Sequence, residues 1–401
     1  MPDAAVASTA MSDERKPVPF LPFAVPDLTE EEVEAVAAVV RDGWINTGPR
    51  AKAFEQEFTA AVGAKHGVAV NSCTAALHVA YDAIGAKAGD EVLVPAMTFT
   101  STAAMVRHLG AKPVIVDVRA DDETIDVDLA ERAITPRTKA IVPVHYAGQA
   151  CELDRVLDLA KRKNLRVVED AAHAFPAKYR GRMIGTFGDV TCFSFYSTKT
   201  ITTAEGGMAC TQNDEWAARM RIMSLHGISK DAWKRYTAEG SWFYEVTAPG
   251  YKYNLTDIAA ALGRVQLKRA HDMLERRAAI ARRYLDAFGG MDALICPTVR
   301  PECEHAWHLF ILRLRTELLT IPREKFIDEL KARGIGTSVH YIPLHLHPWC
   351  REELGSKPGD FPVAEDAYRR TISLPIYSKM TDGDVARVIE AVGDIAKKNR
   401  R

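Results

Sequence analysis

The chain has 401 residues, 47% of them hydrophobic and 26% charged, which is the balance of an ordinary folded globular protein. Its formal net charge is −1, so no overall field would recruit nucleic acid or an anionic membrane, and any anionic ligand must be bound by local groups. Seven cysteines lie far apart without a Cys-x-x-Cys pair, which argues against a disulfide framework or a structural zinc site and fits a reducing compartment.

The N-terminal residues and the hydropathy of the chain indicate where the protein resides. Residues 1–19 carry acidic side chains and lack the hydrophobic region of a signal peptide, so we expect a disordered leader. No apolar run reaches the roughly 18 residues that a membrane-spanning helix needs. We therefore expect a cytoplasmic protein.

From about Asp27 the chain alternates between helical and strand-like segments. Short β-branched runs separated by helices of ten to fifteen residues are typical of βαβ units and a mostly parallel sheet. The loop Gly43–Arg50 contains Gly and Pro. The predicted helices are Thr29–Arg41, Thr74–Ile84, Ser101–Leu109 and Leu153–Lys163, and the predicted strands are Val68–Val70, Glu91–Pro95, Pro113–Val116, Ala140–Val144 and Arg166–Glu169.

The second half has fewer strands for each helix. A polar stretch, Ser229–Ala248, precedes a long proline-free segment, Thr256–Phe288, which we expect to be one helix that bridges two domains. Beyond it we predict strands at His308–Leu314 and Thr337–Tyr341 and helices at Arg323–Arg333 and Asp382–Lys398. The prediction is an α/β fold, with a large domain over residues 20–265 and a smaller α+β domain over residues 266–401.

Lys199 is the first candidate for chemistry. A lysine is usually a solvated surface residue, but this one follows the strand-like run CFSFYS and precedes a Gly-Gly turn. A desolvated lysine has a lowered pKa and becomes the free amine that Schiff-base chemistry requires. Its setting therefore favours a buried, reactive amine.

Asp170 ends the strand-like run LRVVED, 29 residues before Lys199. Open α/β sheets bind ligands at the carboxyl ends of their strands. Alone, Asp170 would be read as a helix cap. Paired with Lys199, it suggests pyridoxal 5'-phosphate (PLP), whose pyridine nitrogen needs a carboxylate if the ring is to act as an electron sink.

Two further segments suit the same cofactor. The run Asn71–Ala76 (NSCTAA) follows a strand and opens a helix, where free backbone N–H groups and the helix dipole favour a phosphate. Ser and Thr are also ordinary helix caps, so this signal is weak alone. Phe99 follows the strand EVLVP and could stack on a flat ring or pack in the core.

Over nearly its whole length, the sequence resembles the DegT/DnrJ/EryC1/StrS aminotransferases, sugar aminotransferases of the fold-type I PLP enzymes. The resemblance rests on a set of short segments that are specific only together. These are TGP with FE (residues 47–49 and 54–55), NSCTAALH, VPAMTF, VVEDAAHA, FSFYSTK with TTAEGGM, GYKYNLTDI (250–258), GIGTSVHY (334–341) and SLP (373–375).

The resemblance implies roles for individual residues. Lys199 occupies the position that forms the Schiff base, Asp170 matches the acid at the pyridine nitrogen, and Phe99 matches an aromatic residue that stacks on the ring. The remaining implied positions are Ser72, Cys73 and Ser194 in phosphate-binding segments, His173 behind the ring, Gln149 in a loop that faces the cofactor, Asn254 reaching the phosphate of the neighbouring subunit, and His340 with Tyr341 beside the substrate. Asn254 thus implies a homodimer with shared active sites.

The resemblance also implies a reaction. A branch of the family with histidine at the lysine position carries out sugar dehydration, so Lys199 favours transamination. L-glutamate would convert PLP to pyridoxamine 5'-phosphate, which then aminates a keto sugar. The segments HYAG (145–148), SLHG (224–227), GYKYNLTDI and HAWHLF (305–310) look most like enzymes acting at C4 of UDP-linked 4-keto sugars. A non-nucleotide ketone, aldehyde or keto-inositol remains an alternative acceptor.

Readings of other classes are weaker. His340, His345 and His347 lack partners for a metal site, and the basic run Lys268–Arg283 reads as the solvated face of a helix rather than a nucleic-acid surface. No G-x-G-x-x-G follows the first strand, so a nicotinamide dehydrogenase is disfavoured. A non-catalytic PLP-fold regulator would be expected to lose the lysine or add a DNA-binding segment. A cysteine desulfurase would have only Cys350 to offer.

Overall fold

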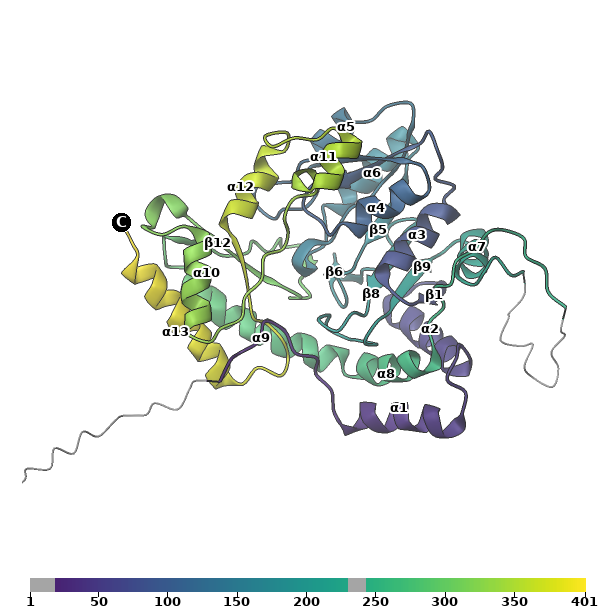
Figure 1. Ribbon diagram of the computed structural model, residues 1–401, viewed down its shortest axis with the longest axis horizontal. Helices are drawn as coiled ribbons and strands as arrows, with labels where there is room; N and C mark the ends of the chain where they lie inside the picture. Colours follow the sequence, from purple (N-terminus) through teal and green to yellow (C-terminus); the bar gives the residue numbers. More distant parts are fainter. Residues whose placement is uncertain (1–18, 230–242) are drawn as a thin grey trace, which may run out of the picture.

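The computed structural model describes residues 19–229 and 243–401 (Figure 1). The predicted leader therefore lies outside the described residues except for Pro19, and so does most of the polar stretch after Ser229. In the described part of the chain, no helix is both long and apolar enough to cross a membrane.

A seven-stranded sheet with the order β1-β9-β8-β5-β4-β2-β3 forms the centre of the molecule. Neighbouring strands from β8 to β3 run parallel, whereas β9 is antiparallel to both of its neighbours. The mostly parallel sheet is confirmed. Its strands are β1 (His66–Val70), β2 (Glu91–Pro95), β3 (Lys112–Val116), β4 (Thr138–Ile141), β5 (Arg166–Asp170), β8 (Val190–Ser194) and β9 (Gly207–Thr211).

Helices cover both faces of this sheet because its side chains alternate between two cores. Val68 and Val70 of β1 point into one core, whereas Ala69 between them points into another. The first core is covered by α3 (Cys73–Ala83), α4 (Ser101–His108) and α7 (Asp214–Ser224). The opposite face is covered by α2 (Pro49–Val62), α5 (Val127–Arg132), α6 (Leu153–Lys163) and α8 (Asp257–Lys268).

The C-terminal part has a core of its own. An antiparallel sheet, β10-β12-β13, packs with three helices around Phe310, Phe326 and Tyr284. This α+β unit agrees with the predicted fold class, and the boundary at residues 265/266 stays a prediction. Its elements are α9 (Ala270–Phe288), β10 (Leu294–Ile295), β12 (Phe310–Leu314), α10 (Arg323–Ala332), β13 (Thr371–Leu374) and α13 (Asp382–Lys398).

The remaining elements connect these two parts. A small antiparallel sheet, β11-β6-β7, pairs a C-terminal strand with a hairpin that follows β5. The helix α1 packs along α8 at the edge of the molecule (Figure 1). Their bounds are α1 (Glu30–Asp42), β6 (Lys178–Tyr179), β7 (Arg182–Met183), β11 (Cys303–Glu304), α11 (Pro348–Leu354) and α12 (Pro362–Arg370).

Two predicted elements differ from the structure, and one strand of the central sheet was not predicted. The segment expected to be one helix breaks at Arg269, so α8 and α9 are separate helices; the guanidinium of Arg269 forms ion pairs with Asp27 and with Glu32 of α1. The expected strand Thr337–Tyr341 is a loop that makes one β-bridge, between Ser338 and Ser373. The strand β9 was not predicted, because its first residue, Gly207, was assigned to the Gly-Gly turn after Lys199.

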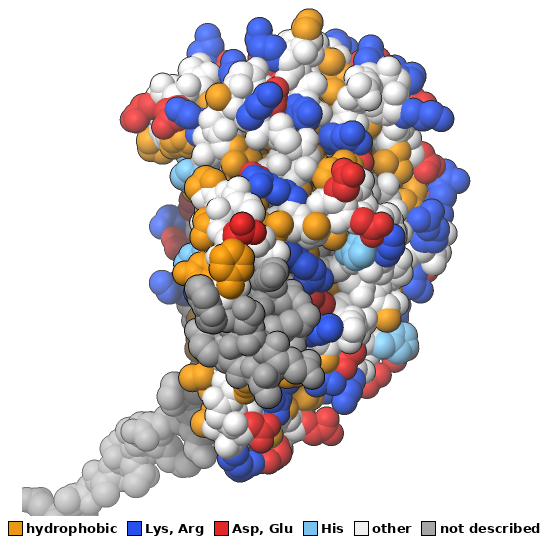
Figure 2. Space-filling view, turned by 90° about the vertical axis from the view of Figure 1, so that its right-hand side faces the viewer, with side chains coloured by type: hydrophobic (Ala, Val, Ile, Leu, Met, Phe, Trp, Pro, Cys, Tyr) orange, Lys and Arg blue, Asp and Glu red, His pale blue; other side chains and the backbone are white. Residues whose placement is uncertain are grey.

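Charged side chains are interspersed on the face that Figure 2 shows, with Lys and Arg next to Asp and Glu. This mixture agrees with the formal net charge of −1. A protein of this kind must bind an anionic ligand with groups gathered in a pocket rather than with a broad surface field.

Candidate active site

A cavity of about 470 Å³ opens at the edge of the sheet where β5 and β8 end. Its wall includes the N-terminus of α3, the turn after β8 and the loop that follows α10. Nine of the predicted residues line it, namely Ser72, Cys73, Phe99, Asp170, His173, Ser194, Lys199, His340 and Tyr341. The carboxyl edge of a parallel sheet is where ligands bind in open α/β folds.

Lys199 lies in the turn that follows β8, and its amine faces the cavity. Burial lowers the pKa of Lys199 to about 8, against the opposing attraction of Asp170. A substantial fraction of the amine is therefore neutral near pH 8 and can act as nucleophile or base. This is the behaviour that the strand-to-turn setting predicted.

Asp170 ends β5 and is buried at the bottom of the cavity. The Thr102 hydroxyl donates to Oδ2 at 2.8 Å, and the Ala172 N–H donates to Oδ1 at 3.1 Å. Burial nevertheless raises the pKa of Asp170 above its ordinary value. A cationic ring nitrogen placed against it would favour the carboxylate, as the pyridine of PLP requires.

The N-terminus of α3 forms a site for an anion. Ser72 caps the helix, with its Oγ accepting the Ala75 N–H at 3.1 Å. The first N–H groups of a helix have no partner within the helix, so those of the first turn can bind a phosphate. Gly207 allows β9 to lie close to the start of α3, because a Cβ at this position would lie 2.5 Å from the Ser72 carbonyl. Burial raises the pKa of the Cys73 thiol, which is not a thiolate.

Aromatic and imidazole side chains form the opposite wall. The Tyr341 hydroxyl and His173 Nε2 are 2.9 Å apart, and His340 Nδ1 lies 2.8 Å from the Ser373 hydroxyl. Burial lowers the pKa of His340 to about 4, so this imidazole is neutral. Phe99 is 55% exposed in the single chain, and its ring centroid lies 6.1 Å from that of Tyr341. A flat ligand could contact this exposed ring.

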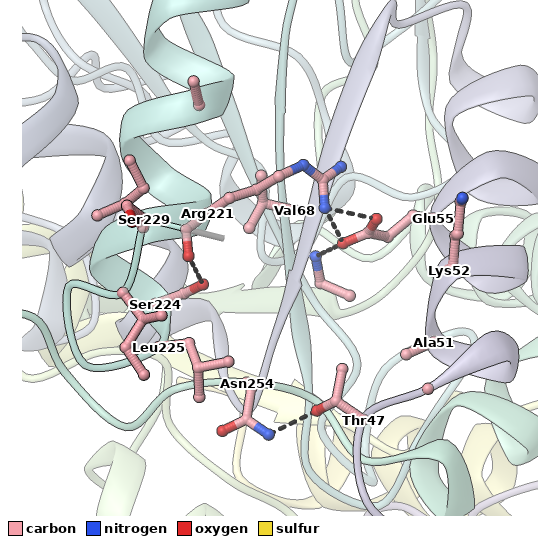
Figure 3. Close-up of a pocket in the computed structure, with 15 residues that line it drawn as sticks. Thr47, Ala51, Lys52, Glu55, Val68, Arg221, Ser224, Leu225, Ser229 and Asn254 are labelled. Atoms are coloured by element: carbon pink, nitrogen blue, oxygen red, sulfur yellow. Dashed lines mark hydrogen bonds and ion pairs between the residues drawn. The ribbon is translucent and has the colours of Figure 1, made fainter. Parts of the chain in front are cut away.

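Two predicted residues lie outside this cavity. Gln149 is buried, accepts the Arg300 N–H at 2.9 Å and lies near Asp122. Asn254 lies on a second cavity, of about 490 Å³, where its amide donates to the Thr47 hydroxyl (Figure 3). The cofactor-binding roles of both residues stay predictions.

Among the lining residues that the sequence did not predict, His308 is the one beside Lys199. His308 Nε2 lies 3.3 Å from Lys199 Nζ, although the sequence offered only the motif HAWHLF without a role for it. Arg277 donates a hydrogen bond to the carbonyl of His308. Arg277 belongs to the basic run Lys268–Arg283, interpreted from its sequence as a solvated helix face. That interpretation is wrong for Arg277, which is buried and donates hydrogen bonds to three carbonyl groups. Helical periodicity alone could have placed Arg277 on the inner face of α9.

A model of the DegT/DnrJ/EryC1/StrS aminotransferase family matches residues 26–393. The chain belongs to this family. It is 50% identical over 381 residues to the spore coat polysaccharide biosynthesis protein SpsC of Bacillus subtilis, covering 94% of this chain and 97% of that protein.

Solved structures agree with this assignment. The putative sugar aminotransferase Spr1654 of Streptococcus pneumoniae, in its PLP form, matches with a TM-score of 0.88 and 36% identity over 94% of this chain and 99% of that one. Its PMP form has also been solved. S. venezuelae DesV in complex with a ketimine intermediate matches with a TM-score of 0.86 and 35% identity, over 95% and 99% of the two chains.

The chain is therefore a PLP-dependent sugar aminotransferase with the fold-type I architecture. The residues at the cavity fit the cofactor, because an amine, a buried carboxylate and a helix N-terminus face one space of sufficient size. The PLP and PMP forms of the relative correspond to the two states that an aminotransferase alternates between.

Proposed function

We propose that this enzyme moves the amino group of L-glutamate to C4 of a UDP-linked 4-keto sugar. The observation that carries the amino-transfer part is that Lys199 and Asp170 face one cavity beside the N-terminus of α3. The segments HYAG, SLHG, GYKYNLTDI and HAWHLF support the C4 position and the UDP carrier. SpsC and Spr1654, by their names, concern polysaccharide biosynthesis and sugar amination, which supports a sugar acceptor.

When bound, PLP supplies an electron sink that makes the Cα–H bond of the amino donor acidic. Asp170 keeps the ring nitrogen protonated, with its own two oxygens held by Thr102 and Ala172. Nζ of Lys199 accepts the Cα proton of the donor and returns a proton in the second half of the reaction. Its pKa of about 8 suits both directions of transfer.

Ser72, Cys73 and Ser194 would hold the phosphate, with Cys73 contributing its backbone N–H rather than its thiol. Phe99 would cover the ring, His173 would lie behind it, and His340 and Tyr341 would face the sugar. We propose in addition that Asn254 serves the cavity of a second copy, in a homodimer. Its position on a different cavity of its own chain supports that assignment. A cytoplasmic location fits the seven free cysteines.

A substrate panel tests the proposal. The purified protein is incubated with L-glutamate and UDP-, dTDP- or GDP-linked 4-keto sugars, and the release of 2-oxoglutarate is measured. We expect release with a UDP-linked 4-keto sugar and none from Lys199→Ala. Turnover with a dTDP or GDP sugar instead would contradict the UDP carrier, and turnover with none of them would contradict the sugar-nucleotide acceptor.

A further inference from the structure

The free amine of Lys199 has a single histidine against it. His308 Nε2 lies 3.3 Å from Nζ, and in the described residues no other side chain forms a hydrogen bond with this amine. The neighbouring polar groups are already engaged, because His173 Nε2 pairs with the Tyr341 hydroxyl and Asp170 accepts from Thr102 and Ala172. His308 is therefore placed to orient the amine.

The backbone around His308 is fixed from two sides. Arg277 of α9 donates to the carbonyls of Trp307 and His308. On the large-domain side, the Leu309 N–H donates to the Ala147 carbonyl at 3.1 Å. The imidazole packs against His173 with 4.4 Å between ring centroids. A ring held in this way keeps its nitrogen in one place while Lys199 changes partners.

The imidazole is also neutral. Burial, followed by the positive charges of Lys199 and Arg277, lowers the pKa of His308 well below its ordinary value. A neutral imidazole accepts a hydrogen bond at one nitrogen, whereas a lysine amine has N–H groups to donate in both of its charge states. Acceptance at Nε2 therefore suits every protonation state of Lys199.

We propose that His308 is a positioning residue for Lys199: its Nε2 accepts one N–H of the amine and so directs the lone pair toward the cavity whenever the lysine is not bonded to the cofactor. The inference rests on the proposed role of Lys199 as the base that moves the Cα proton. The same hydrogen bond stabilises the ammonium that forms when Lys199 accepts that proton, because bonds to charged groups are the stronger ones.

The test uses the apoprotein, so that it depends on neither the cofactor nor the sugar. Lys199 is methylated with formaldehyde and cyanoborohydride across a pH series, and the extent is read from its peptide by mass spectrometry. His308→Met keeps the bulk and removes the acceptor, so the midpoint for Lys199 should fall by about one pH unit. His308→Gln places an acceptor near the Nε2 position and should restore most of the wild-type midpoint.

His305→Gln is the matched control, because His305 is buried in the same segment but bonds the Trp307 N–H instead of Lys199. Its midpoint should equal that of the wild type. In the loaded enzyme, His308→Met should lower kcat by about tenfold to a hundredfold and change KM for glutamate little, and His308→Gln should recover kcat. An unchanged or raised Lys199 midpoint in His308→Met would overturn the proposal, as would a Gln variant that behaves like Met.

A second measurement needs no folded His308 variant. Ring ¹⁵N shifts of labelled histidine in wild-type apoprotein report the tautomer, and the signal of His308 is the one displaced most in Lys199→Ala, because His308 Nε2 lies 3.3 Å from Nζ. We expect an unprotonated Nε2 and a protonated Nδ1. A protonated Nε2, or no histidine signal that responds to Lys199→Ala, would refute the proposed hydrogen bond. Failure of the sugar panel would leave these results unaffected.

Discussion

Asp170→Asn removes one charge from the bottom of the cavity while keeping the shape of the side chain. Asp170 is only 4% exposed and lines the cavity, where it would lie against the protonated ring nitrogen of the cofactor under our proposal. Removing one partner of a buried ion pair costs about 3–5 kcal/mol. At roughly 1.4 kcal/mol for each factor of ten, the variant should lose about two to four orders of magnitude in rate.

The assay is a single turnover of the cofactor-loaded enzyme with L-glutamate, followed by visible absorbance. Cofactor content is measured separately after denaturation, so that lost binding is distinguished from lost rate. Thr102→Val is the matched control: it removes the hydroxyl that bonds Asp170 at 2.8 Å but keeps the carboxylate, and it should lose about tenfold. An Asp170→Asn variant that binds cofactor and retains more than about a tenth of the rate would refute the reasoning.

Three further predictions concern other parts of the fold. Burial raises the pKa of Glu123 from 4.5 to about 7, so its contribution to stability is present below pH 4.5 and is lost as pH rises through 7. In urea unfolding, the free energy of unfolding of the wild type minus that of Glu123→Gln should fall by about 3 kcal/mol over that range, and a constant difference would contradict this. Gly207→Ala should lower cofactor affinity at least about tenfold and lower Tm, because the new Cβ meets the backbone that precedes α3, whereas Gly393→Ala, with open space around its Cβ, should do neither; equal effects would refute the steric argument. Asn254→Ala mixed with Lys199→Ala should regain activity through hybrid dimers if each site takes its asparagine from the partner, and no recovery after subunit exchange would contradict sharing.

The sequence predicted the α/β class and the central chemistry because both depend on local patterns. Short apolar strands alternating with helices indicated the parallel sheet, and the structure confirms it. The settings of Lys199 and Asp170 at the ends of strand-like runs placed them at one sheet edge, and they do line one cavity. Local pattern and ligand position coincide there because the carboxyl ends of parallel strands converge.

The parts that were missed depend on contacts between distant segments. His308 contacts Lys199 although the two residues are 109 positions apart in the sequence, and no local pattern encodes such a contact. Arg277 lies at helical spacing from the buried Met273 and Ile280 of α9, but the carbonyls that accept its hydrogen bonds belong to distant segments. The break at Arg269 likewise lies at a residue that forms ion pairs with the distant Asp27 and Glu32, and it contains no Pro or Gly.

The central claim is that the cofactor is bonded to Lys199. Borohydride reduction of the cofactor-loaded protein, followed by digestion and peptide mass spectrometry, tests it directly. We predict that the added mass lies on the peptide that contains Lys199 and that Lys199→Ala acquires no such mass at any lysine. A reduced adduct on a different lysine, or none on the yellow wild-type protein, would contradict the account.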